Sequence, residues 1–125
     1  MTAVSIIIPT FNRALKVARA ISSTLYQTFT DYEIIVVDDC STDGTADSLS
    51  QFRQHIKYLQ HPKNRGVSAA RNTGIKASSA PLISFLDSDD YWLPEKLSSQ
   101  MEFFSQNRQA VACQTEEIWI RKGVR

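Results

Sequence analysis

The sequence predicts an α/β fold with a mostly parallel sheet and helices on both of its faces. Strand-like runs alternate with helical patterns in the order βαβαβαβ, which is typical of this class. The strand-like runs are almost continuous in apolar residues, as in strands that helices cover on both sides. The 125 residues fit one domain, and a hydrophobic content of 42% is enough to build a core.

The chain begins with two predicted strands and a helix between them. The β-branched run Val4–Ile8 ends at Pro9 and predicts a short buried strand. A helical pattern opens at Asn12 and Arg13, and the second strand, Tyr32–Val37, ends at two acids. The helix is expected to bury one face, formed by Leu15, Ala18, Ile21, Ser22 and Leu25.

The middle of the chain repeats this alternation. Turn and capping residues at 41–45 precede a predicted helix over Thr45–Arg53, and a third strand follows at Ile56–Leu59. Residues 61–66 have the composition of a loop, and a third helix is expected over Val67–Ala77. Small residues give this helix a face for close packing, formed by Ala70, Gly74 and Ala77.

The last predicted elements are a strand, a helix and two further strands. The strand Leu82–Leu86 is expected to be buried, and Pro94 stands where a helix begins. Leu97, Met101 and Phe104 form the apolar stripe of that helix. Two further strands are expected over 110–114 and 118–120.

Acidic residues follow the predicted strands, where parallel sheets bind their ligands. Asp38 and Asp39 follow the second strand, and Asp87, Asp89 and Asp90 follow the fourth. Three carboxylates so close together repel one another, and a hard divalent cation such as Mg²⁺ or Mn²⁺ relieves that repulsion. Such ions usually share carboxylates with substrate phosphates, so this cluster predicts a metal-bound diphosphate.

Composition argues against several other classes of protein. A formal charge of +1, with Arg and Lys spread along the chain, lacks the basic field expected for nucleic-acid binding. Cys40 and Cys113 are expected to be buried free thiols, with one disulfide between them as the alternative, and neither they nor His55 and His61 have metal-ligand spacing. The apolar runs are shorter than the ~20 residues that span a bilayer, and no signal peptide is visible, which predicts a cytoplasmic protein.

Several blocks together resemble the family 2 glycosyltransferases, which have the GT-A (Rossmann-like) fold and act with inversion. The blocks occur in the family's order and fall at the predicted strand ends. They are Val4–Arg13, Gln27–Phe29, Ile35–Thr45, Asn64–Gly74 and Phe85–Asp90. The resemblance implies that residues 1–125 form the nucleotide-sugar-binding part of such a domain, truncated at its C-terminus.

The resemblance also implies a role for individual residues. Pro9 and Thr10, the latter through its backbone, and Asp39, by accepting a base N–H, resemble the positions that hold the nucleotide base. Asp87 and Asp89 resemble the D-x-D pair that binds the metal, with Asp90 supporting them. The complete nucleotide-binding set implied in this way is Pro9, Thr10, Asn12, Arg13, Asp39, Arg71, Asp87 and Ser88.

The implied reaction transfers a sugar from a nucleoside-diphosphate donor, with UDP favoured, to a hydroxyl of a saccharide or lipid-linked acceptor. A carboxylate base should deprotonate that hydroxyl, and in the family it comes later than the D-x-D pair. Glu116 and Glu117 come too early, so the base is expected beyond Arg125 and the fragment is expected to be inactive alone. Apolar surface exposed by truncation would favour a homodimer. The protein would lie at the inner face of the membrane if missing parts of the chain or partner proteins recruit it there.

Two other classes of function remain open on the residues alone. A non-catalytic nucleotide-binding module would have the same pocket but no general base. An aspartate-based phosphotransfer domain, such as a receiver or a haloacid-dehalogenase-like phosphatase, also carries acids at parallel-strand ends. Both phosphotransfer types need acids after the first strand, where this chain has Pro9 and Thr10. For Asp38 and Asp39, capping of the second helix is a further alternative.

Overall fold

The computed structural model describes residues 2–107 and contains a four-stranded sheet with helices packed against it. The strands predicted at 110–114 and 118–120 lie outside the described residues, as do Cys113, Glu116 and Glu117. The elements, in chain order, are β1 (Val4–Thr10), α1 (Ala14–Leu25), β2 (Tyr32–Asp38), α2 (Thr45–Leu49), a 3₁₀ turn (Ser50–Phe52), β3 (Ile56–Gln60), α3 (Val67–Ala77), β4 (Leu82–Phe85) and α4 (Lys96–Gln106).

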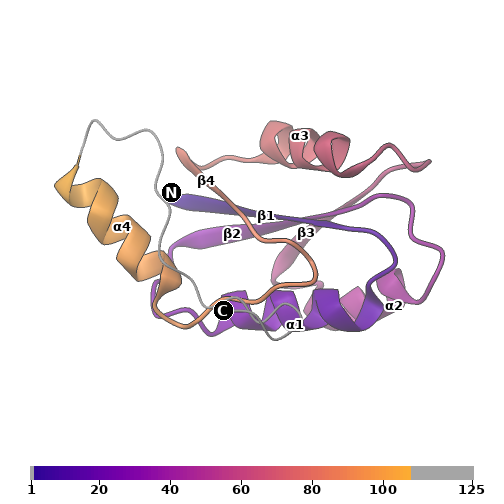
Figure 1. Ribbon diagram of the computed structural model, residues 1–125, viewed down its shortest axis with the longest axis horizontal. Helices are drawn as coiled ribbons and strands as arrows, with labels where there is room; N and C mark the ends of the chain where they lie inside the picture. The colour runs from indigo at the N-terminus through magenta and orange to yellow at the C-terminus, as the bar shows by residue number, and fades with distance from the viewer. Residues whose placement is uncertain (1, 108–125) are drawn as a thin grey trace.

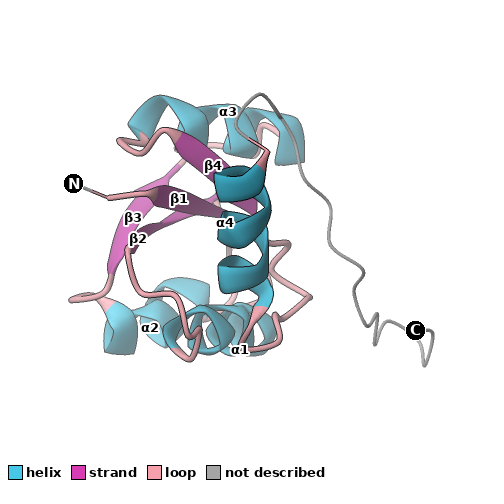
Figure 2. Ribbon diagram, turned by 90° about the vertical axis from the view of Figure 1, so that its left-hand side faces the viewer, coloured by secondary structure: helices cyan, strands magenta, loops and turns pink. Residues whose placement is uncertain are grey.

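All four strands run parallel, in the order β3-β2-β1-β4. Helices α1 and α2 lie on one face of the sheet and α3 on the opposite face (Figures 1 and 2). This arrangement confirms the predicted fold class, a parallel sheet covered on both faces. It also brings the carboxyl ends of β1, β2 and β4 to one edge of the sheet, where the loops after them meet.

The core lies on both faces of β1 and β2, the two central strands. On the α1 face, Ile6, Ile8 and Val36 pack with apolar residues of α1, together with Trp92 and Leu97. On the α3 face the helix approaches so closely that a Cβ added to Gly74 would lie 2.5 Å from Cγ2 of Ile7. The predicted small-residue face of α3 is therefore confirmed.

The buried face of α1 differs from the predicted one. The residues of α1 that are buried are Val17, Ala20, Ile21 and Thr24, whereas 87% of Leu15 is exposed. At 100° per residue, Leu15 lies on the side of the helix opposite this buried stripe. The apolar residues of α1 could be read as either of two buried faces of the helix. The face that β-branched Val17 and Ile21 share is the one that packs on the sheet.

Strand β4 is half exposed, although its apolar run predicts a buried strand. Exposed fractions of 39% for Ile83 and 43% for Phe85 show that its α3-side face is open among the described residues. Helix α3 packs on β1 and β2, while β4 stands at the edge of the described sheet. Leu82 and Leu86 on the other face of β4 pack in the core as predicted.

Several element boundaries also differ from the predicted ones by one or more residues. Strand β1 continues through Pro9, although proline has no backbone N–H to donate. The missing N–H would face β4, and Ile7 is the last residue of β1 that pairs with β4, so no ladder hydrogen bond is lost. The second helix tightens into a 3₁₀ turn at Ser50, and α4 begins at Lys96. Within residues 2–107, no helix combines the length and apolarity that crossing a membrane requires.

Candidate functional site

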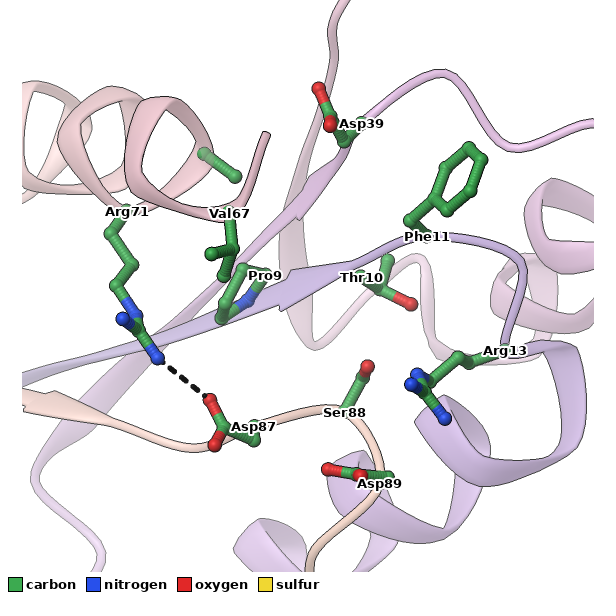
Figure 3. Close-up of a pocket in the computed structure, with 11 residues that line it drawn as sticks. Pro9, Thr10, Phe11, Arg13, Asp39, Val67, Arg71, Asp87, Ser88 and Asp89 are labelled. Atoms are coloured by element: carbon green, nitrogen blue, oxygen red, sulfur yellow. Dashed lines mark hydrogen bonds and ion pairs between the residues drawn. The ribbon is translucent and has the colours of Figure 1, made fainter. Parts of the chain in front are cut away.

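A pocket of about 390 Å³ lies at the carboxyl edge of the sheet (Figure 3). The residues that both line it and were predicted from the sequence are Pro9, Thr10, Arg13, Asp39, Arg71, Asp87, Ser88 and Asp89. Phe11, Val67 and Ala70 also line it and were not predicted, since apolar residues beside a loop carry no distinctive signal. Asn12 is not among the lining residues.

Strand register places these residues side by side. Thr10 at the end of β1 pairs with Asp38 at the end of β2, and the carbonyl of Thr10 accepts the N–H of Asp39 at 2.9 Å. On the other side of β1, the N–H of Leu86 donates to the carbonyl of Ile7 at 3.0 Å. The loop that starts at Asp87 therefore lies beside Pro9 and Thr10.

Asp39 forms one end of the pocket and is almost saturated with hydrogen bonds. Its side chain is 5% exposed, and its Oδ1 lies 2.7 Å from Nδ1 of His61. Oδ1 also accepts the N–H of Arg65, and Oδ2 accepts the N–H of Gly66, both at 2.8 Å. Burial raises the pKa of the Asp39 carboxyl, but these hydrogen bonds outweigh it and the pKa lies below its ordinary value.

Gly66 makes part of this arrangement sterically possible. Its φ is 96°, a left-handed conformation that L side chains rarely adopt, and it immediately precedes α3. The backbone N–H groups of Arg65 and Gly66, just before α3, thus both point to the Asp39 carboxylate. The loop 64–66 is thereby held against the end of β2.

His61 is a buried residue that the sequence placed in a plain loop. Its side chain is 5% exposed, and its Nε2 lies 2.8 Å from Oγ1 of Thr73 on α3. Its backbone N–H donates to the carbonyl of Asp38 at 2.8 Å, which continues the β2–β3 ladder by one residue. His61 therefore connects the Asp39 carboxylate to helix α3.

Asp38 does not line the pocket, and its side chain instead holds neighbouring segments of the protein together. It is fully buried and accepts the hydroxyl of Tyr58 at 2.7 Å and the N–H of Ser41 at 3.0 Å. Burial, followed by the proximity of Asp38, raises the pKa of the Tyr58 phenol. Neither Asp38 nor Asp39 caps α2, where Asp43 accepts the N–H of Thr45 instead.

Asn12 and Cys40 also hold loops near the pocket. Asn12 has a φ of 51°, and its Oδ1 accepts the N–H groups of Thr42 at 2.7 Å and Asp43 at 3.2 Å. This contact ties the loop after β1 to the loop after β2. Cys40 is a free thiol as predicted, but it is partly exposed rather than buried.

The opposite end of the pocket is acidic and open. Carboxylate oxygens of Asp87, Asp89 and Asp90 all lie within 4.8 Å of one another. Nη2 of Arg71 contacts Oδ1 of Asp87 at 3.0 Å, and the two side chains are 39% and 45% exposed. Figure 3 shows Arg71 reaching this acid from α3 while Asp39 lies beyond Pro9 and Thr10. Oxygen ligands at this spacing suit a hard divalent cation.

Two buried polar atoms of pocket residues have no hydrogen-bond partner within the described part of the protein. They are Oγ1 of Thr10 and Nε of Arg71. Buried polar groups are nearly always paired, so each is available to a bound ligand. Trp92, by contrast, is 7% exposed and packs in the core on the α1 face of the sheet.

Comparison with known proteins gives a consistent picture. The family model for Glycosyl transferase family 2 matches residues 5–120. Poly(ribitol-phosphate) beta-N-acetylglucosaminyltransferase TarP of Staphylococcus aureus is 46% identical over 95 residues, which cover 72% of this chain and 29% of TarP. UDP-Glc:alpha-D-GlcNAc-diphosphoundecaprenol beta-1,3-glucosyltransferase WfgD of Escherichia coli is 40% identical over 105 residues, covering 83% of this chain and 42% of WfgD.

A solved structure has the same fold. The crystal structure of Staphylococcus aureus TarS in complex with UDP-GlcNAc superposes with a TM-score of 0.81 at 26% identity, over 96% of this chain and 39% of TarS. The chain thus spans well under half the length of each of these three proteins. The match covers the part of the relatives that corresponds to the sheet and pocket described above.

Proposed function

Because the chain belongs to glycosyl transferase family 2, we propose that it forms the donor-binding part of an inverting, metal-dependent glycosyltransferase that uses a UDP-sugar. The observation that carries the proposal is the pocket, which joins a buried carboxylate at one end to three clustered carboxylates at the other. A nucleoside diphosphate has matching groups, a hydrogen-bonding base and a charged diphosphate. The relatives named for UDP-sugar chemistry support UDP as the first choice.

At the base end, Asp39 accepts an N–H of the nucleotide base and Pro9 packs beside it. The hydroxyl of Thr10 is buried and unpaired among the described residues, so a ligand polar group satisfies it. Arg13, Ser88 and Arg71 line the path toward the acidic end. Asn12 supports this end indirectly, since it holds the 41–43 loop.

At the diphosphate end, the acids fit a divalent cation. Three carboxylates within 4.8 Å supply hard oxygen ligands, and one of them already faces the guanidinium of Arg71. Asp87 and Asp89 would hold Mn²⁺ or Mg²⁺, with Asp90 adjacent. When bound, the ion supplies neutralisation of the charge that grows on the leaving diphosphate. Arg71 adds a fixed positive charge on the same side.

The residues that activate the acceptor are placed elsewhere. Asp39 is buried and assigned to the nucleotide base, and Asp87 and Asp89 are assigned to the metal, so none of these carboxylates serves as the general base in this scheme. We place the general base in a part of the enzyme beyond Arg125 and therefore expect no sugar transfer by the 125-residue chain alone. Acceptors in this scheme are hydroxyls of saccharides or lipid-linked saccharides. Sugar transfer by the chain alone, measured with labelled donor, would contradict this part of the proposal.

A thermal-shift panel tests the donor assignment. UDP, GDP, CDP and dTDP are compared with and without Mn²⁺, and UDP with Mn²⁺ should raise the melting temperature most, because a ligand of the native state stabilises it. Asp89→Ala should lose the metal-dependent part of the shift. Asp31→Ala, which removes an exposed acid at the other edge of the sheet, is the matched control. An equal lack of response to all four nucleotides would overturn the proposal.

A non-catalytic nucleotide-binding module would give the same shifts, so the full-length gene product separates the two. Enzymatic transfer by the longer protein, abolished by Asp89→Ala, supports the enzyme. The aspartate-based phosphotransfer alternative finds no support, since the family differs and Pro9 and Thr10 stand at the end of β1 where its acids would lie.

A further inference from the structure

We propose that His61 positions Asp39 for base recognition and limits it to a base edge that presents a single N–H donor. The inference rests on the proposed function, since it assigns Asp39 to the nucleotide base. His61 itself is not among the pocket-lining residues and acts through Asp39. It is therefore a positioning residue rather than a catalytic one.

The first step is the count of acceptor sites on Asp39. An ionised carboxylate offers about four lone-pair positions, two on each oxygen. Oδ1 already receives His61 Nδ1 at 2.7 Å and the N–H of Arg65 at 2.8 Å, while Oδ2 receives the N–H of Gly66 at 2.8 Å. One position is left, on Oδ2. Asp39 can therefore accept one further N–H and no more.

The second step is the tautomer of His61. The ionised carboxylate only accepts hydrogen bonds, so Nδ1 of His61 must carry the proton that faces it. In the neutral ring Nε2 is then an acceptor, and the Thr73 hydroxyl, 2.8 Å away, donates to it. Asp39 therefore fixes the tautomer of His61, and the Thr73 hydroxyl holds the ring from its other side. A protonated ring would present the same Nδ1–H, so Asp39 keeps this donor in either state.

The third step compares the nucleotide bases. Uracil and thymine present one ring N–H between two carbonyls, and this single donor matches the one open position on Oδ2. Guanine presents a ring N–H and an amino N–H side by side, and a carboxylate binds that pair well only with both oxygens free. Because His61 and Arg65 fill Oδ1, the bidentate arrangement is blocked. Loss of His61 would reopen one position on Oδ1.

The connection through Thr73 gives His61 a second consequence. Thr73 lies on α3 two residues after Arg71, which contacts Asp87 at the acidic end of the pocket. The hydrogen-bonded series Asp39–His61–Thr73 therefore anchors the base end of the pocket to the helix that carries Arg71. Both ends of the site are held by one rigid element.

Calorimetric titration of the 125-residue chain with UDP and with GDP, at constant Mn²⁺, tests the inference. His61→Ala should weaken UDP binding by about tenfold, as expected for loss of one hydrogen bond to a charged group, and should narrow the preference for UDP over GDP. His61→Asn keeps an N–H near the Nδ1 position and should restore most of both. His55→Ala, at an exposed histidine, is the matched control and should behave as the parent chain does.

A second pair of variants keeps the test decisive if His61→Ala does not fold. Thr73→Val removes the hydroxyl at nearly constant volume, and Thr73→Ser keeps it. ¹⁵N NMR of the imidazole should show the Nδ1–H tautomer in the parent chain and in both variants, because the Asp39 carboxylate fixes it. UDP binding should weaken in Thr73→Val alone. A purely structural role for Thr73 would change stability and leave UDP affinity unchanged.

The outcomes separate the inference from the function on which it rests. If the parent chain binds UDP and neither His61→Ala nor Thr73→Val changes the affinity or the UDP-to-GDP ratio, the inference is wrong and the proposed function stands. An Nε2–H tautomer in the parent chain also overturns the inference alone. If the folded parent chain binds no nucleotide at all, the proposed function fails and the inference fails with it.

Discussion

The two ends of the pocket hold carboxylates in opposite states. Asp39 is buried, with an exposed side-chain fraction of 5%, and three protein groups donate to it. Asp87 is 45% exposed, pairs with a half-exposed arginine and stands near two further acids. The same residue type, after the two strands that flank β1, thus has two different environments.

The difference separates stability from ligand response. Removing Asp39 would leave several buried donors without an acceptor, which costs free energy of folding whether or not a ligand is present. The acids at 87–90 repel one another and are better satisfied when a cation is added. The base end is therefore organised by the protein itself, and the acidic end depends on what binds there.

Asp39→Asn is expected to cause the largest loss of stability. The new amide would direct its own N–H toward a backbone or histidine N–H, so the free energy of unfolding should fall by about 2–3 kcal/mol. Asp89→Asn is the matched control at the open end and should change stability by less than about 0.5 kcal/mol without metal. Urea unfolding measures both. Equal effects of the two substitutions would remove the distinction between the ends.

Glu33 tests whether the hydrogen bonds that a carboxylate accepts, rather than its position in the pocket, make it stabilising. At the amino edge of the sheet its Oε2 accepts the Ser5 hydroxyl at 2.5 Å and the Ser79 N–H at 2.7 Å, with Lys57 Nζ at 3.5 Å from Oε1. Burial raises the pKa of this carboxyl, but the hydrogen bonds and Lys57 outweigh it and lower the pKa to about 2.

The sign of the pH dependence follows from that lowered pKa. Because the folded-state pKa is below the unfolded value, the stabilisation is fully present above about pH 4.5 and is lost as the pH falls toward 2. The parent chain should lose roughly 2 kcal/mol of stability from this group over that window. Glu33→Gln should be less stable at neutral pH and lose less on acidification. Unfolding curves with identical pH slopes would contradict this.

Much of this arrangement could be predicted because it depends on local sequence. Apolar runs mark the strands, and the acids that follow them mark the carboxyl edge, so Asp39, Asp87 and Asp89 were predicted to meet in one site and do line one pocket. The bounds of α3, Val67–Ala77, also agree with the structure, since loop residues precede it and small residues continue through it.

What could not be predicted depends on neighbours that are distant in sequence. The half exposure of Phe85 follows from the edge position of β4, and strand order is not written in β4 itself. The contact of His61 with Asp39 follows from the β2–β3 register, in which Asp38 pairs with Gln60 and the next residues continue side by side. In sequence, His61 belongs to a segment with the composition of a plain loop.

Adding Mn²⁺ should change the stability of the protein less than Asp39→Asn or Glu33→Gln does. The cation relieves repulsion among Asp87, Asp89 and Asp90, so the melting temperature should rise by about 1–4 °C at millimolar metal without nucleotide. Asp89→Asn should abolish most of this rise, and addition of a chelator should reverse it in the parent chain. A rise of the same size in the variant would mean that the metal binds elsewhere, and the acidic end would then not be the end that responds to a cation.

Arg71→Ala should have the smallest effect on stability and still weaken donor binding. Its ion pair with Asp87 is half exposed, and such pairs contribute about 0–1 kcal/mol because water screens them. Its Nε is nevertheless buried and unpaired within the described protein, which leaves the guanidinium available to a diphosphate. Urea unfolding should therefore change little while UDP affinity falls about tenfold or more. Arg53→Ala, an exposed arginine away from the pocket, is the control. If Arg71→Ala instead lowers stability as much as Asp39→Asn and leaves UDP affinity intact, the acidic end is a structural cluster and the contrast between the two ends is wrong.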